Sequence, residues 1–192
     1  LVADRKHRAM VLAPTRELAQ QIEEEFAQFT KGMRLFSVSC VGGAPIFNQM
    51  RELKLGVHIV IGTPGRVKDL IARDKIDPST FNTVVLDEAD RMLDMGFIGD
   101  MREILGAMPS EKQGMFFSAT FSPEIKKLCS DFLNDPVNIT VKARDTSSSV
   151  EQGVVHASGR ADKIQKLESI ISSPAASKVI IFRETKRSVD DL

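Results

Sequence analysis

Three acidic side chains within four positions, Asp87, Glu88 and Asp90, follow directly on the apolar run 84–86. This β-branched run is typical of a buried strand in a parallel sheet, and ligands bind beyond the carboxyl ends of such strands. With no basic residue before Arg91, the carboxylates suit a hard cation such as Mg²⁺. In nucleotide hydrolysis the metal neutralises phosphate charge, and a nearby acid orients or deprotonates the attacking water. The pattern also fits a strand followed by an acidic first helical turn.

The rest of the chain predicts the elements that would place these acids at a sheet edge. Short apolar runs alternate with amphipathic helical stretches, which indicates βαβ units and a mainly parallel sheet covered on both faces. We expect strands at 9–13, 35–41, 57–61, 83–86, 114–118 and 137–141. We expect helices at 15–29, 46–53, 63–71, 97–108 and 122–132.

The composition changes after position 141, where periodicity is lost and a Thr/Ser run begins. We therefore predict a first domain at 1–141, a linker at 142–152 and the start of a second domain at 153–192. The second domain is too short to close a core alone. Its predicted strands and helices cover 154–157, 161–171, 178–182 and the residues from 185 onward.

Overall charge and cysteine content limit the classes of function. The 192 residues carry 26 basic and 26 acidic side chains, so a net basic charge does not favour a nucleic-acid binder. A nucleic-acid binder could still use a local basic patch and backbone N–H groups. Cys40 and Cys129 have no metal-ligand spacing and are predicted to be reduced core residues. No apolar run could span a membrane, and we expect a cytoplasmic protein.

Three loops after predicted strands offer exposed backbone N–H groups. They are 14–18, the glycine pair Gly42-Gly43, and the helix start 63–66. Helix starts and glycine turns bind phosphate without net positive charge. Three of them on one sheet edge could follow a sugar–phosphate backbone, with Arg16 and Arg66 adding local charge.

A phosphate loop of the G-x-x-x-x-G-K-[ST] type is not in the sequence, since no glycine is followed by lysine. A nucleotide hydrolase of this fold needs such a loop to hold the phosphates. We therefore expect a strand, the loop and its helix to lie upstream of Leu1, which would make the chain an internal fragment.

These motifs together resemble the DEAD-box RNA helicases. Asp87-Glu88-Ala89-Asp90 spells the motif that names the family. The other matches follow the family order and are Pro14-Thr15-Arg16-Glu17-Leu18-Ala19, Gly42-Gly43 with Gln49, Thr63-Pro64-Gly65-Arg66, Ser118-Ala119-Thr120, and Phe182 to Thr185. The segment 90–97 resembles bacterial members linked to ribosome assembly or RNA turnover. The resemblance implies a RecA-like parallel sheet with helices on both faces, plus the start of a second RecA-like domain.

The resemblance also implies a role for each motif. Asp87 would hold Mg²⁺ through water, and Glu88 would orient or activate the water that attacks ATP. The residues implied to couple the nucleotide state to RNA binding are Asp90, Ser118, Ala119 and Thr120. The residues implied to contact the RNA backbone, largely independently of base sequence, are Pro14, Thr15, Arg16, Gly42, Gly43, Thr63, Pro64, Gly65, Arg66, Phe182 and Thr185.

On this resemblance the chain is a piece of an RNA-stimulated ATPase that uses ATP and Mg²⁺ to open short RNA duplexes or remodel RNPs. The isolated chain is expected to be catalytically incomplete, because half of the phosphate contacts fall outside it. One alternative is a non-catalytic RNA-binding module, against which the retained segment 118–120 argues. A second is a DNA helicase or another phosphate-loop NTPase, against which 14–18 together with Asp90 argue.

Overall fold

The computed structural model describes residues 7–141, 151, 153–174 and 176–192. Its contacts divide the chain into two compact units, Leu1–Asn138 and Ile139–Leu192, which are described separately. The predicted linker at 142–152 lies outside the described residues except for Glu151.

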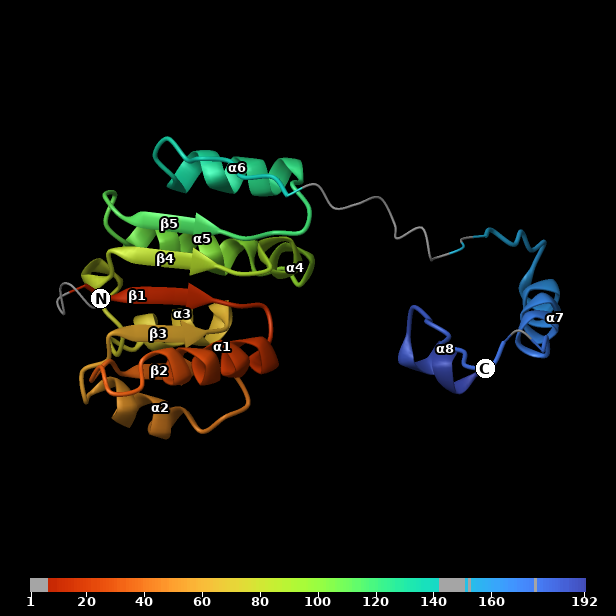
Figure 1. Ribbon diagram of the computed structural model, residues 1–192, viewed down its shortest axis with the longest axis horizontal. Helices are drawn as coiled ribbons and strands as arrows, with labels where there is room; N and C mark the ends of the chain where they lie inside the picture. The colour runs from red at the N-terminus through yellow and green to blue at the C-terminus, as the bar shows by residue number, and fades with distance from the viewer. Residues whose placement is uncertain (1–6, 142–150, 152, 175) are drawn as a thin grey trace. The chain divides into compact units, whose positions relative to one another are not determined.

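The first unit is built on a sheet of five parallel strands in the order β2-β3-β1-β4-β5 (Figure 1). The strands are β1 Ala9–Leu12, β2 Ser37–Cys40, β3 Ile59–Gly62, β4 Thr83–Leu86 and β5 Gln113–Phe116. Leu12 lies opposite Gly62 on one side and Leu86 on the other, and Leu86 lies opposite Phe116. This register brings the carboxyl ends of the strands to one level, which is the edge where ligands bind in parallel sheets.

Helices connect these strands, as the sequence predicts. They are α1 Arg16–Phe29, α2 Ile46–Leu53, α3 Pro64–Ala72, the 3-10 turn η1 Pro78–Thr80, α4 Ala89–Asp94, α5 Ile98–Ala107 and α6 Pro123–Phe132. Side-chain caps begin two of the α-helices, because Thr15 accepts from the Leu18 amide and Ser122 accepts from the Ile125 amide. Pro64 occupies the start of α3, where its missing N–H has no helical partner to lose. The sequence predicts no bounds for the short helix α4, but Asp90 lies in its first turn, as the alternative of an acidic helix start after 84–86 expects.

Helices cover both faces of the sheet, which confirms the predicted fold class. On one face, Met10, Leu12 and Val84 pack against α2, α3, α5 and α6. The buried helical residues there are Val67, Leu70, Met101, Ile104, Leu105, Ile125 and Leu128. On the other face, Ala9 and Ile61 pack against α1. Each fully buried large aliphatic side chain contributes roughly 1.5–3 kcal/mol to folding, so these two layers fix the strand ends in place.

Two details differ from expectation, one within the first unit and one where it ends at Asn138. The predicted strand at 137–141 is not formed, and Val137 and Ile139 are exposed. A strand needs a neighbouring strand for its backbone hydrogen bonds, and this segment pairs with no described strand, although β5 leaves one edge of the sheet open. Leu18, Ile22, Phe26 and Phe29 recur at steps of three and four and predict one apolar stripe, but Phe29, the last residue of α1, is 75% exposed.

The second unit contains the helices α7 Arg160–Ile171 and α8 Lys186–Asp190. Thr185 and Ser188 form a reciprocal capping box at the start of α8, where the sequence predicted a helix. The predicted strands at 154–157 and 178–182 are not formed, and the apolar side chains of Val154, Ile180 and Phe182 are exposed. These segments pair with no described strand, so the β-propensity of their sequence is not realised. In the described part of the chain, no helix is long and apolar enough to cross a membrane.

Candidate functional site

Five loops meet at the carboxyl edge of the sheet in the first unit. Each follows one strand: 13–16 follows β1, 41–45 follows β2, 63–66 follows β3, 87–90 follows β4 and 117–120 follows β5 (Figure 1). These loops contain every site residue that the sequence predicted in the first unit. The parallel order therefore brings together motifs that are separated by up to about a hundred positions in the chain.

The acidic loop is fixed by backbone hydrogen bonds on both sides. The Asp87 amide donates to the Leu12 carbonyl at 3.0 Å, and the Ala89 amide donates to the Phe117 carbonyl at 2.9 Å. Between them, the Glu88 amide donates to Oδ1 of Asp87 at 3.0 Å. The loop thus continues the sheet pattern beyond the strand ends, so the Asp87 and Glu88 carboxylates are held close to rigid elements.

Glu88 lies in the left-handed backbone region, with φ 50° and ψ 51°, at the cap position of α4. A non-glycine residue in this region is strained, and such strain is concentrated at functional sites. Its Oε2 accepts from Nη1 of Arg91 at 3.0 Å, in an ion pair in which both side chains remain about half exposed. The turn directs the chain from β4 into α4 while it leaves the Glu88 carboxylate at the edge.

A hydrogen-bonded cluster joins Asp90 to the loop after β5. Both the amide and Oγ1 of Thr120 donate to Oδ2 of Asp90 at 2.9 Å. The Asp90 amide donates to Oγ of Ser118 at 3.3 Å, and that hydroxyl donates to the Thr120 carbonyl at 2.7 Å. Ala119 lies between them and is exposed. Asp90, Ser118 and Thr120, which the family resemblance groups, are therefore in direct contact.

The charge of Asp90 is stabilised by this cluster. Partial desolvation acts to raise its pKa, but the hydrogen bonds from Thr120 and from the Arg91 amide outweigh this effect, and the pKa lies below its usual range. Asp90 is thus an ionised acceptor that locks two loops together. A change in the conformation of either loop would therefore affect the other loop through the Asp90 carboxylate.

Asp87 is placed as a carboxylate that could hold Mg²⁺ together with water and the phosphates of a bound nucleotide. It is half-buried, one oxygen accepts the Glu88 amide, and it forms an ion pair with no described Lys or Arg. No group of three or more His, Cys, Asp or Glu side chains among the described residues is arranged to hold a metal. Mg²⁺ in nucleotide sites is commonly held by one or two carboxylates together with water and phosphates, and Asp87 fits that role.

The glycine loop after β2 is joined to the helix start after β1. Nη1 of Arg16 donates to the Gly42 carbonyl at 3.4 Å. Gly43 has φ +76°, and a Cβ there would overlap Nη1 of Arg16. The close approach of the guanidinium therefore requires glycine at position 43. Pro14 is buried and Thr15 caps α1, so the first loop is rigid.

The same glycine loop is joined to the start of α3. Nη1 of Arg66 donates to the Ala44 carbonyl at 3.2 Å and to Oε1 of Gln49 at 2.9 Å. Thr63 and Pro64 are buried at this helix start, whereas Gly65 is exposed. Thr63 occupies the N-cap position of α3, but its side chain makes no capping hydrogen bond.

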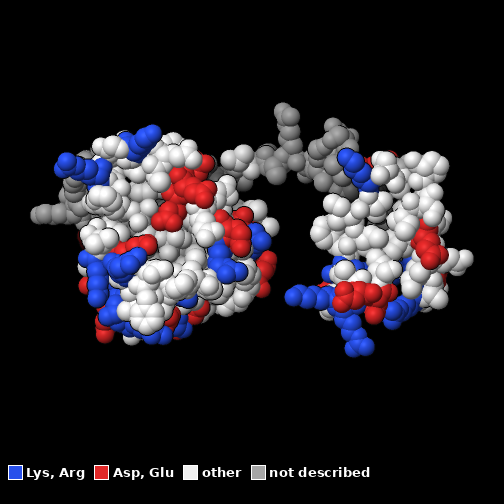
Figure 2. Space-filling view, turned by 90° about the horizontal axis from the view of Figure 1, so that it is seen from below, with Lys and Arg blue, Asp and Glu red and all other residues white. Residues whose placement is uncertain are grey.

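Charged side chains of both signs lie on the surface of the first unit. Figure 2, seen from the α2 side, shows Lys and Arg interspersed with Asp and Glu over the first unit. This agrees with the net charge of zero. A phosphate ligand at the edge would therefore be held by backbone N–H groups and by the two placed arginines, Arg16 and Arg66.

Comparison with known proteins identifies the family. The DEAD/DEAH box helicase family model matches residues 2–128. The chain belongs to this family. The DEAD/DEAH box helicase assignment covers all five loops of the candidate site.

Similar proteins agree with the family assignment. The chain is 46% identical to the RNA helicase CrhR of Synechocystis over 185 residues, which cover 96% of this chain and 38% of CrhR. It is 43% identical to the DEAD-box ATP-dependent RNA helicase CshA of Bacillus licheniformis, with the same two coverages. The chain thus spans about two fifths of the length of these relatives.

Solved structures show the same fold. A DEAD box protein from Methanococcus jannaschii is 33% identical, with a TM-score of 0.69 over 96% of this chain and 49% of that protein. A hypothetical ATP-dependent RNA helicase from Sulfolobus tokodaii is 36% identical, with a TM-score of 0.64 over 68% of this chain and 39% of that protein. The sheet and helices of this chain are therefore those of a DEAD-box RecA-like domain.

Two predicted site residues belong to the second unit, and one residue of the first unit received no role from the sequence. Phe182 and Thr185 belong to the second unit, where Phe182 is exposed and Thr185 caps α8. The sequence places Gln49 only within the glycine motif, yet its side chain contacts two of the five loops, at Val41 and at Arg66. Its signal was a polar residue on the otherwise apolar inner stripe of α2, which contains Ile46, Met50 and Leu53.

Proposed function

We propose that the chain is part of an ATP-dependent RNA helicase that couples ATP binding and hydrolysis to local RNA duplex opening or RNP remodelling. One observation carries this proposal, namely the cluster of Asp90, Ser118 and Thr120 directly beside the acidic loop. A module that only bound RNA would not need two loops locked through an ionised carboxylate next to Asp87 and Glu88. The curated relatives, named as RNA helicases, support the same proposal.

RNA would be held through its backbone at three loops of the edge. The residues proposed to contact it are Pro14, Thr15, Arg16, Gly42, Gly43, Thr63, Pro64, Gly65 and Arg66. Backbone N–H groups and guanidinium groups bind phosphate and sugar, which carry no base sequence. Binding would therefore be largely independent of sequence. Phe182 and Thr185, in the second unit, are proposed to contribute further backbone contacts.

ATP and Mg²⁺ would act at the acidic loop. Asp87 would hold the metal through water, and the metal would neutralise phosphate charge. Glu88, at the edge and paired with the exposed Arg91, would orient the attacking water. The 192-residue chain alone would not turn over ATP, since its sequence has no phosphate loop to complete these contacts. The cytoplasmic location expected from the sequence remains a prediction.

RNA binding by the purified chain tests the backbone part of this proposal. Fluorescence anisotropy would be measured with labelled single-stranded RNA of two unrelated sequences over a salt series. Similar affinities for both sequences, and a loss of affinity in Arg16→Met and Arg66→Met, are expected. Binding that depends on base sequence, or that is unchanged in both variants, would contradict backbone recognition by these loops.

Nucleotide hydrolysis tests the enzymatic part. The purified 192-residue chain is expected to show no RNA-stimulated ATP turnover, whereas a longer protein that contains this chain and a phosphate loop is expected to show it. ATP turnover by the 192-residue chain that disappears in Glu88→Gln would contradict the expectation that this chain is catalytically incomplete. Unwinding of DNA duplexes but not RNA duplexes by the longer protein would instead support a DNA helicase.

A further inference from the structure

Gln49 is one of two buried polar side chains in the described part of the chain, the other being Thr63. It is 5% exposed and lies on the inner stripe of α2, beside Met50 and Leu53, which pack on the core. A buried amide without partners destabilises a fold. An apolar residue at this helical position would pack without that penalty, so the contacts made by the amide are the feature that needs explanation.

Both ends of the Gln49 amide are hydrogen-bonded, and each bond goes to a different loop of the site. Nε2 donates to the Val41 carbonyl at 3.0 Å, and Oε1 accepts from Nη1 of Arg66 at 2.9 Å. The same Nη1 donates to the Ala44 carbonyl at 3.2 Å. Gln49 therefore joins Val41, at the beginning of the glycine loop 41–45, to the Arg66 guanidinium, which also contacts Ala44 near the end of that loop.

The arrangement uses only one nitrogen of the Arg66 guanidinium. Nε and Nη2 make no hydrogen bond to any described residue. A guanidinium fixed along one edge keeps its planar fork oriented, so its remaining donors are set for an oxyanion. Without the amide, Arg66 would keep one weak contact to a carbonyl and would gain rotamer freedom that binding must remove.

We propose that Gln49 is a positioning residue for RNA backbone binding. Its amide fixes Arg66 and the glycine loop in one relative orientation, and it acts through these groups without touching RNA. The inference rests on the proposed function, because it assumes that Arg66 and the glycine loop bind phosphates. It adds to that function the requirement that two of the binding loops be locked together by one buried side chain.

The test compares Gln49→Met, which keeps the length of the side chain and removes both hydrogen bonds, with Arg66→Met in the full 192-residue chain. Gln49→Met is expected to weaken RNA binding about tenfold, as expected for the loss of a hydrogen bond to a charged group. The slope of log affinity against log salt is expected to become shallower by about 0.7, as for the loss of one phosphate contact on a single strand. The double variant is expected to bind no more weakly than Arg66→Met.

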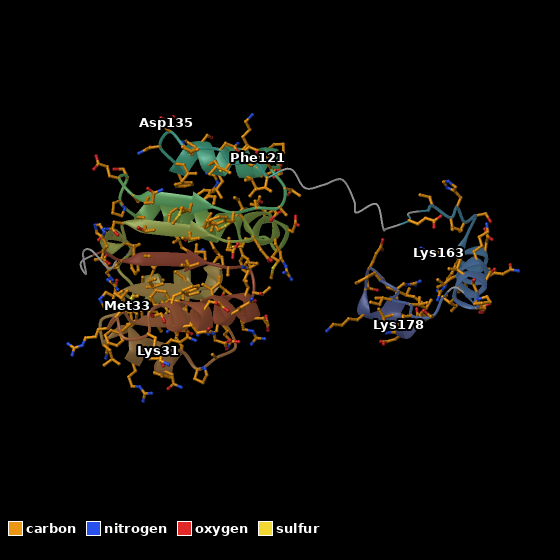
Figure 3. All side chains as sticks on the ribbon, in the orientation of Figure 1. Lys31, Met33, Phe121, Asp135, Lys163 and Lys178 are labelled. Atoms are coloured by element: carbon orange, nitrogen blue, oxygen red, sulfur yellow. The ribbon has the colours of Figure 1, made fainter. Side chains whose placement is uncertain are left out.

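A purely structural role for Gln49 predicts a different result. It would lower the urea midpoint of unfolding but leave the RNA affinity and the salt slope of the folded chain unchanged, and that result would overturn the proposal. Gln28→Met is the matched control, since Gln28 is an exposed residue whose backbone carbonyl accepts from the Lys31 amide. Lys31 and Met33 lie at the far end of the unit from the strand carboxyl ends (Figure 3), so this control should leave RNA affinity unchanged.

Urea unfolding is measured for the wild type, Gln49→Met, Arg66→Met and the double variant. Together with RNA binding, it distinguishes failure of the positioning role of Gln49 from failure of the proposed RNA-binding function. Non-additive losses in unfolding free energy would show the Gln49–Arg66 contact in solution, whether or not RNA binds. A wild-type chain that binds no RNA would overturn the proposed function, and the positioning role with it. A chain that binds RNA while Gln49→Met binds equally well, with an equal salt slope, would overturn the positioning role alone.

Discussion

The Asp90 carboxylate accepts two hydrogen bonds from Thr120, from its amide and its hydroxyl, and both are 2.9 Å long. Thirty positions separate the two residues, and each follows a different strand of the sheet. The contact is possible because β4 and β5 are adjacent and end at the same level. It makes the loop beside Asp87 and Glu88 mechanically dependent on the loop after β5, which is the arrangement that a nucleotide-coupled switch requires.

Asp90→Asn is expected to change the pH dependence of stability. Because the pKa of Asp90 is lower in the folded chain, its charge adds stability above the unfolded pKa of about 4. This stability is lost as the pH falls through the folded pKa. The free energy of unfolding of the wild type should therefore exceed that of Asp90→Asn by about 1 kcal/mol at neutral pH. This difference in stability should shrink below pH 4. Urea unfolding of both chains between pH 3 and pH 7 measures it, and a difference that grows on acidification would contradict the assignment.

Glu88→Gly is expected to be more stable than Glu88→Ala by about 1 kcal/mol, because residue 88 has φ 50° and only glycine adopts this region without strain. Both substitutions remove the ion pair with Arg91, so that loss cancels in the comparison. Glu25, an exposed residue within α1, is the control. There glycine should be less stable than alanine by a similar amount. Equal urea midpoints for the two Glu88 variants would show that the left-handed turn is not retained.

The architecture of the first unit could be predicted because each element has a local signal. The run 83–86 and the helix 46–53 were predicted with the bounds that the structure has. The segments 137–141, 154–157 and 178–182 have the same apolar, β-branched signal, but they form no strands. A strand also requires a partner edge, and that is a property of the whole assembly of strands, which local sequence does not contain.

The candidate site could be predicted as a set of loops, but not as a network. Parallel strands place Asp90 and Thr120 at one edge, and the family resemblance had grouped these two residues. The hydrogen bonds of Gln49 depend on how α2 is rotated against the sheet and on where the Arg66 side chain reaches. Such contacts between distant segments leave no periodic trace in the sequence beyond a polar residue on an apolar stripe.

Cys40 is expected to resist alkylation in the folded chain, whereas Cys129 is expected to react slowly. Burial raises the pKa of the Cys40 thiol to about 12, and it raises the pKa of the partly buried Cys129 less strongly. The thiolate is the reactive form, so little of it exists at Cys40 near neutral pH. Iodoacetamide labelling at pH 8 followed by peptide mass spectrometry should find label at Cys129 first, and at Cys40 only after urea is added. Early label at Cys40 would show that the face packed against α2 and α3 opens.

Gly43→Ala is expected to weaken both stability and RNA binding, whereas Gly42→Ala is expected to leave the fold intact. Gly43 has φ +76°, a region that costs an L-residue about 1 kcal/mol or more. Its new Cβ would also displace the Arg16 guanidinium from the Gly42 carbonyl. A Cβ at Gly42 meets no atom within 4 Å.

Urea unfolding and RNA anisotropy of the two alanine variants measure these effects side by side. The steric part of the Gly43→Ala effect comes from the far end of a flexible arginine, so Arg16→Ala should relieve it but not the cost of the backbone angle. Gly43→Ala/Arg16→Ala should thus be about as stable as Gly43→Ala or slightly more stable, yet bind RNA weakly. Equal losses of stability in Gly42→Ala and Gly43→Ala would mean that the left-handed turn at position 43 does not define this loop.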